Sequence, residues 1–93
     1  MPAAISVERQ RDGHYRVEVR EGGSSSTHQV SVRPDYQQRL AGGRVSAEEL
    51  VRRSFEFLLE HEPKESILSE FDLAVIQRYF PDYEREIRRR LGG

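Results

Sequence analysis

The first third of the chain alternates apolar and polar residues, which is the pattern of strands that bury one face. The alternation is clearest in "YRVEV", where Tyr15, Val17 and Val19 share one face and charged residues occupy the other. The same spacing occurs before and after this stretch, up to Pro34. It predicts three strands, over about residues 3–10, 14–21 and 27–33.

The turn between the first two predicted strands, "RDGH", can be tested for register. A two-residue Asp-Gly loop would place Val7 opposite Glu18, so that an apolar residue would share a face with a charged one. A three-residue loop over residues 11–13 places Val7 opposite Val17 instead, and Gly13 then takes the left-handed conformation that this loop needs. We therefore predict the second register.

After Pro34 the apolar residues recur with the spacing of helices. A short helix should begin near Pro34 and end at Gly42. Ser46 and Glu49 form a capping box, which begins a long amphipathic helix that Pro63 stops. The expected helices cover about residues 35–41, 46–61, 64–70, 72–79 and 81–91.

The segment "FDLAVIQRYFPDYEREI", residues 71–87, is the richest in apolar and aromatic residues, and a proline interrupts it. A proline inside a helix loses a hydrogen bond and clashes with the preceding turn. Phe80 should therefore leave the helical conformation, and Pro81 should be the first residue of the final helix. The order of elements predicts an α+β fold, in which a three-stranded antiparallel meander carries all the helices on one face.

The composition sets limits on function. A chain of 93 residues has the length of one small domain. Its 15 basic and 16 acidic residues give a net charge of −1, so no overall field attracts nucleic acid or a membrane. The absence of cysteine excludes disulfides, thiolate metal sites and cysteine nucleophiles. Neither a signal peptide nor an apolar run of the roughly 20 residues that span a membrane is present, so we expect a cytoplasmic protein.

The residues that could carry chemistry do not form a recognisable catalytic pattern. None of the three histidines has metal-ligand spacing to another. His28 and His61 both fall on apolar faces and could meet in space, but the simpler prediction places each at the rim of the core, bonded to backbone. Serines 24–26 lie in "EGGSSST", which we predict to be a flexible four-residue loop without a nucleophile or phosphate-binding motif. We therefore predict no catalytic residue, no metal and no cofactor.

Two groups of residues remain as candidates for binding. Tyr79 and Tyr83 flank the proline, and a tyrosine can bury its ring while its hydroxyl stays in water. Arg88, Arg89 and Arg90 form a basic run, although the helix dipole and nearby acids also explain it. The leading hypothesis is a small non-enzymatic binding or regulatory module, acting through a protein partner or as a homodimer. The alternative is a weak nucleic-acid-binding protein that uses the arginine run.

Three stretches of the chain also carry a resemblance. "STHQV", "SFEFLLEHEPKESIL" and "FDLAVIQRYFPDYEREI" resemble a group of short, uncharacterised bacterial proteins, over about residues 13–87. The resemblance implies a bacterial cytoplasmic protein. It implies no activity and no catalytic residues.

Overall fold

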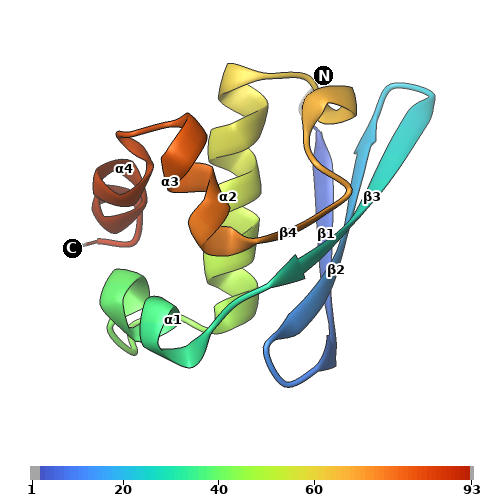
Figure 1. Ribbon diagram of the computed structural model, residues 1–93. Helices are drawn as coiled ribbons and strands as arrows, with labels where there is room; N and C mark the ends of the chain where they lie inside the picture. The colour runs from blue at the N-terminus through green and yellow to red at the C-terminus, as the bar shows by residue number, and fades with distance from the viewer. Residues whose placement is uncertain (1–2, 93) are drawn as a thin grey trace.

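The computed structural model describes residues 3–92, in which a mixed sheet is covered by helices on one face (Figure 1). The sheet has the strand order β1-β2-β3-β4. Its strands are β1 (Ala4–Arg11), β2 (His14–Glu21), β3 (Ser24–Ser31) and β4 (Glu70–Asp72). The helices are α1 (Pro34–Ala41), α2 (Ala47–His61), α3 (Ile76–Tyr79) and α4 (Tyr83–Arg90), with short 3-10 turns η1 (Lys64–Ser66) and η2 (Leu73–Val75).

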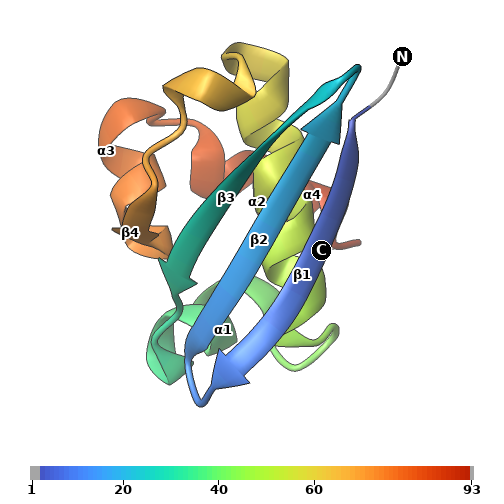
Figure 2. The same cartoon turned by 90° about the vertical axis from the view of Figure 1, so that its right-hand side faces the viewer.

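The long helix α2 lies between the sheet and the C-terminal helices. Figure 2 shows the outer face of the sheet open, with α2 crossing behind it, and Figure 1 shows α4 on the side of α2 away from the sheet. Phe55 points to the sheet, where its ring meets His28 and Phe71. Phe57 points the other way and meets Tyr83. The prediction that the C-terminal helical pair packs on the sheet is therefore wrong for α4, because α2 and α1 bury it instead.

The predicted register of the first hairpin is confirmed, since Val7 pairs with Val17. The predicted loop is wrong in one detail. Arg11 pairs with His14 across a two-residue turn, and a bulge just before Arg11 supplies the extra residue that restores the register. Gly13 has the predicted left-handed conformation, with φ of 75°.

The second turn is tighter than predicted. Glu21 pairs with Ser24, so the turn consists of Gly22 and Gly23 alone, and Gly22 takes the positive φ of 64° that such a turn requires. The serines that we expected in a flexible loop are the first residues of β3, which spans Ser24–Ser31 and not residues 27–33. Serine carries no apolar alternation, so the pattern gave no sign that the strand begins at Ser24.

The fourth strand is absent from the prediction. β4 pairs parallel to β3, which makes the sheet mixed and corrects the three-stranded antiparallel meander. The amide of Gln29 donates to the carbonyl oxygen of Ser69 at 2.8 Å, and the hydroxyl of Ser31 donates to Asp72 at 2.9 Å. The helix expected over residues 64–70 shrinks to η1 because the chain after it is extended. The α+β class itself is confirmed.

The ends of the helices follow the expected signals in most places. The Ser46 hydroxyl accepts a hydrogen bond from the amide of Glu49 at 3.1 Å, as the capping box predicts. Phe80 leaves the helical conformation, with φ of −132° and ψ of 90°. Pro81, however, is not the first residue of α4. It lies in a turn closed by the bond from the Tyr83 amide to the Phe80 carbonyl, at 2.9 Å.

Candidate functional site

An apolar groove of about 340 Å³ opens between the C-terminal part of α2, the segment from η1 to β4, and α3. Its walls are aliphatic and aromatic. Glu62 is the one charged residue that lines it. The apolar side chains that form its walls include Leu58, Ile67, Phe71, Val75, Ile76 and Phe80. Such a concave apolar site with few polar groups is typical of binding pockets.

Two large apolar side chains border this groove and face solvent. Leu68 is 47% exposed and Tyr79 is 66% exposed, and no other large hydrophobic residue among residues 3–92 is as exposed. Single exposed apolar residues are common on protein surfaces, whereas apolar residues gathered around one hollow mark an interaction site. We therefore take the apolar groove, with Leu68 and Tyr79 at its border, as the candidate functional site.

The fold fixes where the backbone of both residues lies. Tyr79 is the last residue of α3, which ends where Phe80 leaves the helical conformation. Leu68 lies between η1 and β4, and its carbonyl oxygen bonds with Nδ1 of His28 at 2.7 Å. This bond ties the Leu68 segment to β3, so one border of the apolar groove is anchored to the sheet. The pattern predicted Tyr79 as a binding residue but missed Leu68, which is the one apolar side chain of "SILSEF" left outside the core.

The structure separates the two candidate tyrosines. Tyr83 is fully buried, and its hydroxyl lies 2.6 Å from the hydroxyl of Ser54. Burial raises the pKa of Tyr83 above its usual value, because the anion would lose its hydration. Tyr79, in contrast, is mostly in water. Only Tyr79 can therefore touch a partner, and Tyr83 serves the core.

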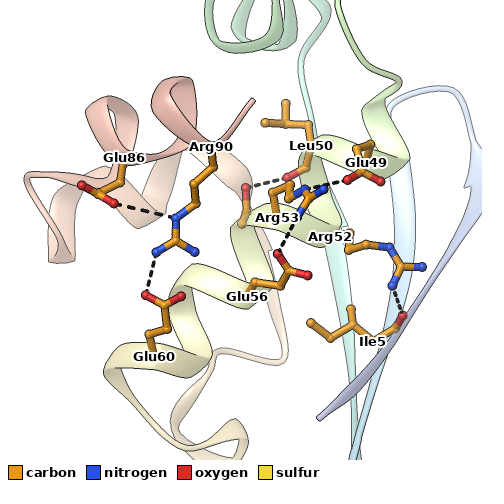
Figure 3. A network of polar contacts seen from close by, with 10 residues as sticks. Ile5, Glu49, Leu50, Arg52, Arg53, Glu56, Glu60, Glu86 and Arg90 are labelled. Carbon is orange, nitrogen blue, oxygen red and sulfur yellow. Dashed lines mark hydrogen bonds and ion pairs between the residues drawn. The ribbon is translucent and has the colours of Figure 1, made fainter. Parts of the chain in front are cut away.

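The arginine run is divided as well. Arg89 pairs with Glu86 at 2.6 Å. Arg90 pairs with Glu60 on α2 at 2.6 Å (Figure 3). The Arg90 guanidinium also lies over the ring of Phe57, 5.7 Å from its centroid. Arg88 is exposed and has no ion pair among residues 3–92. Two of the three arginines that the nucleic-acid alternative would use are thus already paired with carboxylates.

Replacing Arg90 with methionine should lower the free energy of unfolding by about 0.5–1 kcal/mol, because an ion pair that stays partly exposed contributes little. The hydrogen bond from Arg90 lowers the pKa of Glu60. A carboxylate with a lowered pKa stabilises the fold above its unfolded pKa, and this contribution is lost as the pH falls through the folded pKa. The difference between wild type and Arg90→Met should therefore narrow in acid, as measured by thermal unfolding. Arg88→Met, the matched control, should change stability by less than about 0.5 kcal/mol.

The two histidines of the apolar faces lie apart. His28 is only 2% exposed, and its Nε2 lies 2.8 Å from the Ser26 hydroxyl. Since the Leu68 carbonyl can only accept, Nδ1 carries the hydrogen of the bond to Leu68. His61 is exposed and its ring packs against that of Phe57 at a tilt of 54°, with ring centroids 4.5 Å apart. Residues two apart on a helix diverge by about 200°, so Phe55 and Phe57 place these histidines on opposite sides of α2. Among residues 3–92, no three His, Asp or Glu side chains come together as a metal site requires.

Comparison with known proteins adds no relative. No protein-family model matches this chain, and no curated protein or solved structure matches it significantly. The resemblance to short bacterial proteins therefore stays a prediction. Within residues 3–92, none of the helices combines the length and the apolar character needed to cross a bilayer.

Proposed function

We propose that this protein is a small, non-enzymatic interaction module, which holds a large apolar side chain of a partner polypeptide in the apolar groove. One observation carries the proposal. The two most exposed large apolar side chains of residues 3–92, Leu68 and Tyr79, both border the same apolar hollow. The chain has no cysteine, which suits a reducing compartment, and we propose that the protein acts in the cytoplasm.

The dimensions of the groove set the kind of contact. A hollow of about 340 Å³ receives one or two side chains, which matches an interface built around a central anchor residue. Interfaces of this kind lie at the small, transient end of the range of protein–protein contacts. We therefore propose that the partner binds the groove reversibly and does not form an obligate assembly with this protein.

The charge at the groove specifies the partner further. Glu62 lines the apolar groove and has no ion pair among residues 3–92. A carboxylate beside an apolar hollow favours a cation in the partner, next to its anchor residue. The expected ligand is a segment with a large apolar side chain flanked by arginine or lysine.

A display selection of random peptides on the wild-type protein tests this proposal. Enriched peptides should share a large apolar residue beside a basic one. Leu68→Ser should weaken their binding by about tenfold or more, because truncating a contact at the anchor site costs about 1.4 kcal/mol or more.

Leu91→Ser makes the same chemical change away from the apolar groove, and it should leave peptide binding unchanged. Thermal unfolding of both variants verifies that each is folded. If no peptide family is enriched, or if Leu68→Ser binds the selected peptides as well as wild type does, the groove is not a binding site.

A further inference from the structure

We infer that the polypeptide that fills the apolar groove is a second copy of this chain, an inference that rests on the proposed function. The protruding Tyr79 and the hollow belong to one surface patch. A patch that holds both a protruding side chain and a hollow can complement itself across a two-fold axis. Each copy then inserts its Tyr79 into the groove of the other, and the two insertions are identical by symmetry.

The chemistry of Tyr79 fits the groove that would receive it. The apolar walls of the groove accept the face of an aromatic ring. The tyrosine hydroxyl is a donor, and the carboxylate of Glu62 in the opposite copy is the charged acceptor within the same groove. Tyrosine therefore satisfies both the apolar and the polar part of this site.

Charge complementarity supports the same occupant. Arg78 precedes Tyr79, is exposed, and has no ion pair among residues 3–92. Glu62 is equally without a cationic partner. A two-fold contact brings Arg78 of each copy toward Glu62 of the other, which forms the pair twice. This chain thus contains both features expected of the ligand, which are a large apolar side chain and a cation next to it. Its net charge of −1 causes little repulsion between two copies.

The size of the molecule sets the expected strength. A standard stable interface buries about 800 Å² on each partner, whereas the whole described surface is 5,696 Å². A contact centred on two tyrosine anchors takes a small share of that surface. The dimer should therefore be weak and reversible, and the fraction of protein in the dimer should rise as the protein concentration rises.

Sedimentation velocity over about 10 μM to about 1 mM, the range of weak transient contacts, measures this dimer. Tyr79→Ser should raise the dimer Kd by about tenfold or more, since it removes the anchor. Leu91→Ser, outside the patch, should leave the Kd unchanged.

A charge exchange gives the sharper test. Glu62→Arg alone and Arg78→Glu alone should each lose the dimer, because each places like charges together at both contacts. An equimolar mixture of the two variants should dimerise again, because the mixed pair restores an opposite charge at each contact. Circular dichroism verifies that both variants are folded.

The outcomes separate this inference from the proposed function. If the wild-type protein stays monomeric at every concentration but still selects peptides through Leu68, the inference of a homodimer is wrong and the proposed binding groove is supported. If the wild-type protein neither dimerises nor selects peptides, both the homodimer and the binding groove are wrong. A dimer that is indifferent to Tyr79→Ser, or variants that fail to recover on mixing, would place the contact on another face and overturn the inference.

Discussion

Tyr83→Ala should lower the free energy of unfolding by about 3–5 kcal/mol, the usual cost of deleting a buried aromatic ring. Tyr83 is fully buried between α4 and α2, with its ring centroid 5.5 Å from that of Phe57. The substitution leaves a cavity and takes from Ser54 its partner at 2.6 Å. Small domains have only about 5–15 kcal/mol of stability, so this variant should be close to unfolding.

Denaturation in urea measures the effect, and two variants make it decisive. Tyr83→Phe keeps the ring and removes only the hydroxyl, whose partner Ser54 still donates to the Leu50 carbonyl, so it should cost about 1 kcal/mol. Tyr79→Ala removes an exposed tyrosine and should change stability by less than about 0.5 kcal/mol. Equal losses for Tyr83→Ala and Tyr79→Ala would contradict the division of the two residues between core and surface.

His28→Ala should be the next most damaging of these substitutions, at about 2–4 kcal/mol. The imidazole is buried against Phe55, with ring centroids 5.3 Å apart, and its Nδ1 donates to the Leu68 carbonyl. Without the ring, a cavity opens and that carbonyl loses its donor. The loss should also loosen the segment between η1 and β4, which forms one border of the apolar groove.

Hydrogen exchange of residues 67–72, together with urea denaturation, measures both effects. His28→Leu fills most of the volume and loses only the hydrogen bonds, so it should cost about 1–3 kcal/mol and still speed exchange in this segment. His61→Ala is the matched control, since His61 is exposed, and it should leave exchange at residues 67–72 as in wild type. Exchange that is unchanged in His28→Leu would mean that the bond to Leu68 does not hold the segment.

The core supports the candidate site through α2 and through His28. The long helix α2 buries Phe55 toward the sheet and Phe57 toward α4, so one helix joins two layers. The apolar groove lies where the end of α2 meets α3 and the chain before β4. Leu68 and Tyr79 are therefore presented by segments that a packed core and one histidine hold in position.

The alternation and the helical spacing were enough to predict much of the fold. Three strands, the register of Val7 against Val17 and the capping of α2 at Ser46 all follow from neighbouring residues. β4 was not predicted because its three residues are too few to show alternation, and because backbone bonds to β3 define it. The tight turn at Gly22 was not predicted because the serines after it carry no apolar pattern that would indicate a strand.

The candidate site, like the fold, was predictable from the sequence only in part. The chain by itself determined the local elements, the break at Phe80 and the balance of charge, because dihedral preferences and apolar periodicity act between near neighbours. Only the tertiary structure decided that Tyr83 is buried while Tyr79 and Leu68 border one groove. Burial depends on which surfaces meet, and residues 58, 68 and 79 meet through the packing of α2, the β4 segment and α3, which no local pattern encodes.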